Sequence, residues 1–458
     1  MSKESIVIAA ARRTPIGSFQ GALSAPAAPE LGAAAARAAL ADAGVGGGEV
    51  SEVILGCVLP AGLGQAPARQ AALAAGIPDS VGCTTINKVC GSGMKAVMFG
   101  HDLLRAGSAR VVLAGGMESM SNAPYLLPKA RAGYRMGHQQ VLDHMFFDGL
   151  QNPYDGNMMG HFAEQTAQKY GFAREAQDAF AIETVRRALA AIEGAFAAEI
   201  TPVTVKTRRG EQLVATDEEP GRCELDKIAS MRPAFAKDGT VTAASSSSIS
   251  DGAAALVLMT EGEAERRGVR PLARIVGHGG YAHAPEWFTT APVSAMKNLL
   301  ERLGWSTGDV DLYEINEAFA VVAMAAIHDL GLDPAKVNVN GGACALGHPI
   351  GATGARLLVT LVHALKARGL KRGVASLCIG GAEPRPPSEP VSWKLPELER
   401  PGTDEDIAFL SILEQASLLK SRKLTSVELT RIYLDRIHRF DPVLHAVVTL
   451  TEDRAMKQ

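Results

Sequence analysis

The chain has 458 residues, of which 47% are hydrophobic and 21% are charged, and its formal net charge is -3. This length exceeds what one hydrophobic core normally serves, so two or more domains are expected. The small net charge excludes a global field that would attract nucleic acid or an anionic membrane, and no uncharged apolar run reaches the ~18 residues that span a bilayer.

The cysteines and the N-terminus indicate a compartment. Six cysteines stand at positions 57, 83, 90, 223, 344 and 378, without C-x-x-C pairs or the density of a disulfide scaffold. Arg12 and Arg13 follow the apolar stretch Ile6 to Ala11, the reverse of the order in a signal peptide. The sequence therefore predicts a cytoplasmic protein with free thiols, no metal and no membrane segment.

The first half alternates short apolar runs with helical segments. Ile6 to Ala11, Ile54 to Cys57 and Val111 to Ala114 have the length of buried strands, and Leu31 to Ala43 predicts a helix that ends at Gly44. This alternation predicts an α/β fold in which helices cover both faces of a parallel or mixed sheet. Residues 119–231 are richer in aromatic, Met and charged residues, and they include the amphipathic segment Arg174 to Ile192, so they are expected to form an inserted loop domain.

A weak internal repeat indicates a duplicated core. In the first half, an expected strand leads to Cys90, then a helix, then a strand that ends at Gly116. In the second half, an expected strand leads to His348, then a helix, then a strand that ends at Gly381. Two halves related in this way would bring the Cys90 loop and the His348 loop together. Two unrelated strand-helix-strand units would, however, give a similar sequence pattern by chance.

The composition changes after Gly381. Residues 382–390 contain four prolines in nine positions, which is typical of a linker rather than a buried strand. Asp404 to Lys420 and Ser426 to Phe440 are amphipathic and predict two helices, too few for an independent core.

Cys90 is a candidate nucleophile. It follows an expected strand and precedes an expected helix, and unpaired N–H groups and the dipole at a helix N-terminus favour a thiolate. His348 lies in a glycine-rich loop that exposes its imidazole, which could take the proton from a thiol. Each residue alone also fits an ordinary structural role.

Two further side chains lie where strands are expected to end. Cys378 would face the crevice at the edge of the sheet, where its thiol could transfer a proton to or from a substrate. It could instead be a small apolar residue of the strand. The Asn316 amide could hold a water, or it could cap the following helix.

Six motifs occur together and in one order: Ala11 to Ser18 (ARRTPIGS), Asn87 to Gly93 (NKVCGSG), Ala114 to Ser119 (AGGMES), Asn316 to Phe319 (NEAF), Gly347 to Gly351 (GHPIG) and Cys378 to Gly381 (CIGG). This combination resembles the thiolase family, specifically acetyl-CoA acetyltransferases, over residues 1–381. The resemblance implies a duplicated βαβαβ core in α-β-α-β-α layers. Residues 1–118, completed by about 232–270, would form the N-terminal half, and residues 271–381 the C-terminal half.

The resemblance also implies a ping-pong acyl transfer that makes or breaks the carbon-carbon bond of a 3-oxoacyl-CoA. Cys90 would carry the acyl group, His348 would accept its proton, and Cys378 would exchange a proton with the α-carbon. His348 and a water on Asn316 would stabilise one oxyanion, and the N–H groups of Cys90 and Gly380 the other.

Coenzyme A thioesters are the implied substrates, with no separate cofactor, and a homo-oligomer, a dimer or a tetramer, is the implied assembly. Ser247, Phe235 and Phe319 would contact the pantetheine arm, and Leu150 and Met158 the thioester end. The run 245–248 could instead be a plain serine-rich linker. Ser245 stands where the family commonly has Asn, and Met158 where biosynthetic members often have His, so chain-length preference is left open.

The resemblance ends after Gly381, where thiolases continue into a closing strand and this chain has Ala382-Glu-Pro. From about Pro386, with a linker at 382–403 and helices at 404–458, the sequence resembles the N-terminal region of amidase-signature enzymes, notably at Thr403 to Leu410 and Thr425 to Arg436. That family's catalytic Ser-Ser-Lys residues lie further downstream, so amide hydrolysis is not expected. The alternatives are a catalytically silent thiolase chain, a ketoacyl synthase, against which Cys378 and the Gly-His-Pro loop argue, and an amidase.

Overall fold

The structure is a computed structural model that describes residues 4–207, 210–380 and 397–444. It divides into two compact units, Met1–Arg385 and Pro386–Gln458. Each unit is described by itself. The expected linker at 382–403 and the expected loss of a closing strand fall mostly on residues 381–396, outside the described residues.

The strands of the first unit are β1 Ile6–Arg13, β2 Gly17–Ser18, β3 Glu52–Gly56, β4 Gly82–Ile86, β5 Val111–Ser119, β6 Tyr125–Leu126, β7 Leu142–Asp143, β8 Val203–Thr207, β9 Gly210–Val214, β10 Ser250–Thr260, β11 Ala273–Ile275, β12 Leu312–Ile315 and β13 Gly373–Ser376. Its α-helices are α1 Ala28–Asp42, α2 Pro67–Ala74, α3 Ser92–Ala106, α4 Met159–Tyr170, α5 Arg174–Ile192, α6 Glu261–Arg267, α7 Ala291–Leu303, α8 Ala320–Leu330, α9 Ala343–Leu346 and α10 Thr353–Ala367.

The first sheet is mixed, with the strand order β11-β1-β10-β5-β3-β4, and β2 pairs with β10. β3 runs parallel to β4 and β5, whereas β10 runs antiparallel to both β5 and β1. β10 and β5 are buried along nearly their whole length, as expected for strands with helices on both faces. The predicted apolar runs in the first half are therefore strands.

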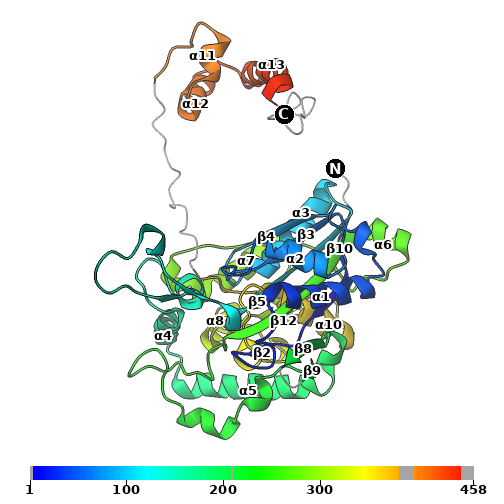
Figure 1. Cartoon of the computed structure of the whole chain (residues 1–458), viewed down its shortest axis with the longest axis vertical. Helices are drawn as coiled ribbons and strands as arrows, with labels where there is room; N and C mark the ends of the chain where they lie inside the picture. Colours follow the sequence, from blue (N-terminus) through cyan, green and yellow to red (C-terminus); the bar gives the residue numbers. More distant parts are fainter. Residues whose placement is uncertain (1–3, 208–209, 381–396, 445–458) are drawn as a thin grey trace. The chain divides into compact units, whose positions relative to one another are not determined.

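Alternate residues of these strands pack against different helix pairs. Leu113 and Val257 belong to a core cluster with Leu31 of α1 and Ala71 of α2. Figure 1 shows α1 and α2 as the blue helices beside this sheet. Val112 and Leu258, which point to the opposite face, belong to a second cluster with residues of α3 and α10. One face of the sheet is thus covered by α1 and α2, and the other by α3 and α10.

A second, parallel sheet is formed by β12 and β13. Leu312 packs on Leu361 of α10, whereas Tyr313 and Ile315 pack with residues of α7 and α8. Helix α10 therefore lies between two sheets, which gives the predicted order of layers, α-β-α-β-α.

The duplication differs in one detail from the sequence-based expectation. β4, α3 and β5 follow the expected order around Cys90, but a short helix, α9, precedes His348 instead of a strand. The remnant of strand pairing there is the isolated parallel bridge between Tyr313 and Val337. The strand expected before His348 was therefore a wrong prediction, although the helix after it, α10, is present.

Residues 119–231 contain α4, α5 and the small sheets β6-β7 and β8-β9, in agreement with their different composition. Helix α5 begins and ends at the residues predicted from its amphipathic pattern, Arg174 and Ile192. Its buried residues include Val185 and Ala188, which pack with Leu346 beside the His348 loop.

The second unit has a small apolar cluster of its own, centred on Ile407, Leu418, Leu424 and Ile432. Its described helices are α11 Asp404–Ala408, α12 Ile412–Lys420 and α13 Ser426–Leu444. The single helix predicted for 404–420 is two helices, because Ser411 begins a new one: its hydroxyl accepts from the N–H of Glu414, whose carboxylate accepts from the N–H of Ser411.

Every helix in the described ranges of both units is too short or too polar to cross a membrane.

Candidate active site

A strained turn connects β4 to α3. Val89, a β-branched residue, has φ of +46° in the left-handed region that such residues normally avoid. The Ser92 hydroxyl holds the turn closed: it accepts from the N–H of Lys88 at 2.8 Å and donates to the carbonyl of Val89 at 2.6 Å. Strain of this kind costs roughly 1–3 kcal/mol and is concentrated at functional sites. The residue that this turn presents is Cys90.

Cys90 is half-buried, and burial raises the pKa of its thiol to about 11, although the N–H groups of Gly380 and of Cys90 itself lower it in part. The N–H groups thus act in the expected direction, but burial outweighs them, so the pKa is raised and not lowered. The neutral thiol is the stable form, so its activation requires a base.

Glycines allow three loops to meet at Cys90. A Cβ on Gly91 would lie 2.6 Å from Cδ1 of Ile379, and a Cβ on Gly93 would lie 3.0 Å from the carbonyl oxygen of Gly351. The first contact joins the Cys90 turn to the Cys378 loop, and the second joins it to the His348 loop. Larger residues at either position would separate the two halves of the core.

The base candidate is His348, which is buried. The backbone N–H of His348 donates to the carbonyl of Ser248 at 3.0 Å, and the ring nitrogen Nδ1 lies 2.6 Å from the hydroxyl of Thr353. Burial, together with the charge of Arg356, lowers the pKa of the imidazole to about 3. Nε2 is buried and has no hydrogen-bond partner among the described residues. The imidazole is therefore neutral, and its Nε2 is free to contact a substrate.

Cys378 and Asn316 follow the neighbouring strands β13 and β12. The N–H of Asn316 donates to the carbonyl of Ser376 at 2.9 Å, which holds the two strand ends together. Cys378 is fully buried, and its thiol pKa is raised well above the usual value by burial and by the proximity of Cys90. Both amide atoms of Asn316 are buried without a partner in the part of the chain that the structure describes, so the amide does not cap α8.

A buried carboxylate fixes the His348 loop to the first sheet. Glu118, at the end of β5, accepts from the N–H of Val58 at 2.9 Å, of Leu59 at 3.1 Å and of Gly351 at 2.9 Å. Burial nonetheless raises the pKa of Glu118 to about 7. Because Gly351 lies three residues after His348, this carboxylate sets where the imidazole stands.

The expected thioester contacts lie at the edges of the site. Leu150 and Cys90 pack against the same apolar cluster, which contains Met145 and Ile350. Met158 pairs with Gln151 in an isolated antiparallel bridge at the start of α4, and the next residue, Met159, would be 3.2 Å from a Cβ on Gly380.

The expected pantetheine contacts form a second group. The rings of Phe235 and Phe319 meet edge to face with centroids 5.8 Å apart, in an apolar cluster that includes Cys378. The N–H and hydroxyl of Ser247 both donate to the carbonyl of Ala318 at 3.0 Å, so the serine run is tied to the Asn316 loop. It is therefore an ordered part of this site and not a linker.

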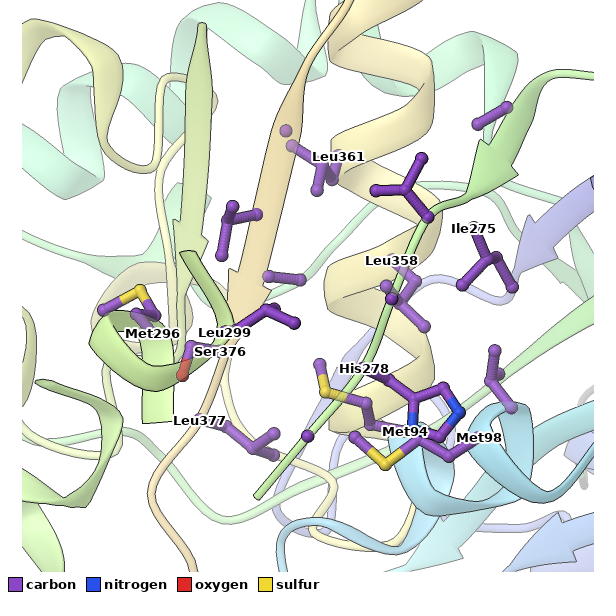
Figure 2. A pocket seen from close by; sticks show the side chains of 18 of the residues that line it. Met94, Met98, Ile275, His278, Met296, Leu299, Leu358, Leu361, Ser376 and Leu377 are labelled. Atoms are coloured by element: carbon purple, nitrogen blue, oxygen red, sulfur yellow. The ribbon is translucent and has the colours of Figure 1, made fainter. Parts of the chain in front are cut away.

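A cavity of about 1610 Å³ has Gly91 and Gly380 among its lining residues. Figure 2 shows Leu358, Leu361 and Leu377 among the side chains that line it. It is lined mainly by apolar residues of α3, α7 and α10 and by the segment that follows β11, including Met98, Leu299 and Leu361. None of the five residues expected to contact coenzyme A lines it. The cavity is thus separate from the expected substrate contacts.

Three residues of the site were not predicted from sequence: Val89, Glu118 and Thr353. Glu118 and Val89 stand inside motifs that were recognised, and Thr353 follows His348 by five residues in a glycine-rich run. Their positions in these motifs indicated that they matter for the site. Their roles could not be predicted, because they depend on contacts with residues elsewhere in the chain or, for Val89, on its backbone conformation.

Taken together, the two layered sheets and the loops that carry Cys90, His348 and Cys378 define an α/β protein with a buried candidate site. Comparison with known proteins then gives the family. The thiolase N-terminal domain matches residues 6–262 and the thiolase C-terminal domain matches residues 269–385. The chain belongs to the thiolase family.

Several named relatives are similar over most of their length. The acetyl-CoA acetyltransferase of Pseudomonas aeruginosa is 51% identical over 383 residues, covering 83% of this chain and 98% of the relative, and that of Rhizobium meliloti is 52% identical over 383 residues, covering 83% and 97%. The crystal structure of the Bacillus anthracis acetyl-CoA acetyltransferase superposes with a TM-score of 0.81 at 45% identity, covering 83% of this chain and 96% of that chain. These names agree with the function predicted from the motifs.

Proposed function

We propose that this chain is an acetyl-CoA C-acetyltransferase that catalyses the reversible condensation and thiolysis of 3-oxoacyl-CoA through an acyl group on Cys90. The observation that carries the proposal is the neutral Cys90 thiol beside the N–H of Gly380, in a buried site that also holds an uncommitted imidazole nitrogen on His348. The similarity to acetyl-CoA acetyltransferases supports acetyl-CoA as the substrate.

In the thiolytic direction, the thiol proton of Cys90 passes to Nε2 of His348, and the sulfur attacks the 3-oxo carbon of the substrate. The bond between carbons 2 and 3 then breaks, its electron pair stays on carbon 2, and this carbanion takes a proton from the thiol of Cys378. Acetyl-CoA leaves, and the acyl group remains on Cys90. The high pKa of Cys378 suits this role, because a thiol must hold its proton until a strongly basic carbon accepts it.

Coenzyme A then attacks the acyl-cysteine, and its thiol proton passes to the Cys378 thiolate. The sulfur of Cys90 leaves as a thiolate and recovers its proton from His348, so both cysteines and the imidazole return to their initial states. Condensation is the reverse sequence, in which Cys378 removes the α-proton of acetyl-CoA.

Negative charge forms on two oxygens, and two sets of donors serve them in this proposal. The N–H groups of Cys90 and Gly380 stabilise the oxyanion of the acyl-cysteine, while protonated Nε2 of His348 and a water on Asn316 stabilise the thioester oxygen of acetyl-CoA. The unpaired amide of Asn316 supports the second set, because a buried amide without a partner costs roughly 1–3 kcal/mol unless a ligand or water satisfies it. Removing one such donor commonly reduces the rate about a hundredfold to a thousandfold.

We propose that coenzyme A lies along Ser247, Phe235 and Phe319, with its thioester near Leu150 and Met158. The link from Ser247 through Ala318 to the Asn316 loop supports this path. We further propose that the protein acts in the cytoplasm, as a dimer or tetramer of identical chains, and needs no cofactor besides its substrates.

The test is to mix the purified protein with acetoacetyl-CoA and CoA and follow the loss of the enolate absorbance. The proposal expects loss of the absorbance with the native chain, and a rate at least about a hundredfold lower with Cys90→Ser, because the hydroxyl is a far weaker nucleophile. Folded native protein that leaves the absorbance unchanged favours the alternative of a catalytically silent chain.

For the second unit, we propose that residues from about 386 onward are related to the N-terminal region of amidase-signature enzymes. The motifs around Thr403 and Thr425 support this relationship. Each threonine begins a helix and caps its first turn: the Thr403 hydroxyl accepts from the backbone N–H of Asp406, and the Thr425 hydroxyl accepts from the backbone N–H of Glu428. The proposal expects no hydrolysis of simple aryl amides by the chain, since the catalytic serines and lysine of that family are not among these residues. A hydrolysis rate above background would contradict it.

A further inference from the structure

Two histidines and an aspartate meet at the rim of the cavity described above, outside the candidate active site. Asp102 Oδ1 lies 3.0 Å from His101 Nδ1 and 2.9 Å from His278 Nε2, and the two histidine nitrogens are 3.1 Å apart. His101 and Asp102 are neighbours on α3, whereas His278 comes from the segment after β11 (Figure 2). This trio is the one group of at least three metal-binding side chains within the described residues.

Protons satisfy this triangle only in part. If both imidazole nitrogens carry hydrogens and donate to Asp102, the two N–H groups face each other across 3.1 Å. If His278 instead donates to a bare nitrogen on His101, that nitrogen presents its lone pair to the carboxylate at 3.0 Å. Every assignment leaves one of the three contacts repulsive or shares one hydrogen between two acceptors. A cation at the centre would accept a lone pair from all three atoms at once.

The spacing is close to that of a tetrahedral metal site. Zinc binds histidine nitrogens and carboxylate oxygens at about 2.0–2.2 Å, which places neighbouring ligand atoms roughly 3.3 Å apart. The sides of the triangle would therefore need to lengthen by only a few tenths of an ångström. Two nitrogens and one oxygen are donors that suit Zn²⁺ better than Mg²⁺ or Ca²⁺, which prefer oxygen ligands.

The surroundings allow an ion to enter but limit its affinity. The side chain of Asp102 is 56% exposed, whereas those of His101 and His278 are 15% and 25% exposed, so the fourth position can face solvent. Two cations lie nearby: Arg302 donates to the carbonyl of His278, and Arg105 lies close to His101.

We propose that His101 Nδ1, Asp102 Oδ1 and His278 Nε2 bind one Zn²⁺, which fastens α3 to the segment that follows β11. This departs from the expectation that the chain binds no metal. His101 and Asp102 are on α3, which begins just after Cys90, and His278, from the segment after β11, lies beside Met94 and Met98 of the same helix in Figure 2. A bound ion would hold that segment in place, so the site is assigned a structural role independent of the acyl transfer.

The chain provides a matched control. His328 and Asp329 are also neighbours on a helix, α8, and His328 Nδ1 lies 2.8 Å from Asp329 Oδ1. No third metal-binding side chain joins them in the described ranges. His328→Ala therefore removes a histidine with the same type of neighbour, yet leaves the proposed site intact.

The experiment is a calorimetric titration of the chelator-treated full chain with ZnCl₂, for the native protein, His278→Ala, His101→Ala and His328→Ala. The proposal expects the native chain and His328→Ala to bind one more equivalent of Zn²⁺ than the other two variants. Comparing variants cancels zinc that binds to the free cysteines. Equal stoichiometry and affinity in all four proteins would overturn the proposal and leave a hydrogen-bonded trio without metal.

Thermal unfolding gives a second readout, because an ion that binds only the folded state raises the melting temperature. Zn²⁺ is expected to raise it for the native chain and His328→Ala, but not for His278→Gln, whose amide keeps the side chain's bulk and polarity. If His278→Ala does not fold, the glutamine variant replaces it in the titration. An equal zinc-induced shift in His278→Gln would contradict the assignment.

Discussion

The hydroxyl of Thr353 lies 2.6 Å from Nδ1 of His348 and donates its own hydrogen to the carbonyl of Pro349 at 3.0 Å. A hydroxyl has a single hydrogen, so when that hydrogen goes to Pro349, Thr353 accepts from His348, and we infer that the imidazole proton is on Nδ1. Nε2 is then the basic nitrogen. This one contact selects the tautomer that the proposed proton transfer from Cys90 requires.

Replacing Thr353 by valine tests this relationship. The variant leaves the N–H at Nδ1 buried without an acceptor, at a cost of about 1–3 kcal/mol, and kcat for thiolysis is expected to fall roughly 5- to 150-fold. Thr353→Ser keeps the hydroxyl and is expected to retain most of the activity. The measurement is steady-state kinetics with both variants. Equal rates for valine and serine would show that the hydroxyl does not position His348.

The pH dependence of alkylation tests the state of the Cys90 thiol. Only the thiolate reacts, and with a pKa raised to about 11 its fraction grows tenfold for each pH unit below that value. The rate of modification of Cys90 by iodoacetamide, followed by peptide mass spectrometry, is therefore expected to rise without a plateau from pH 7 to pH 10. A plateau near pH 7 would indicate a stable thiolate and contradict this account.

Glu118→Gln tests the connection between the first sheet and the His348 loop. The amide keeps the shape of the carboxylate but offers one acceptor oxygen to three N–H donors, so at least one donor is left unpaired or faces another donor. The free energy of unfolding is expected to fall by about 2 kcal/mol, and kcat to fall as well because Gly351 loses its anchor. Denaturant unfolding and kinetics provide the two measurements. An unchanged unfolding midpoint would contradict the proposed anchoring.

The turn before Cys90 predicts an unusual order of stabilities. Val89→Gly removes the penalty for a positive φ, whereas Val89→Ala keeps that penalty and loses side-chain packing. The glycine variant is therefore expected to unfold at a higher denaturant concentration than the alanine variant. Its kcat is expected to be lower than that of the native chain, because the turn no longer holds Cys90 in one conformation. An alanine variant more stable than the glycine variant would show that the turn is not strained.

The layered fold was predictable because local pattern and burial agree. Runs such as Val111 to Ala114 are apolar at every position, as expected for a strand that is covered by helices on both faces. The amphipathic pattern of α5 identified both of its ends. The prediction of a strand before His348 was wrong. The residues there, Ala343 to Leu346, form a helix, and an apolar run of this length does not distinguish a strand from a helix.

For the active site, sequence motifs indicated Cys90, His348, Cys378 and Asn316 but not what holds or titrates them. The pKa of Cys90 depends on burial by residues distant in the chain, which outweighs the N–H groups that a sequence can suggest. The trio of His101, Asp102 and His278 could not be predicted either, since His278 is 176 positions from Asp102 and no motif spacing connects them.

The central claim is a covalent acyl group on Cys90, and intact-mass measurement after incubation with acetyl-CoA tests it most directly. The account predicts a mass increase of one acetyl group for the native chain and none for Cys90→Ala. A native chain without the added group, or an alanine variant that still carries it, would contradict the account.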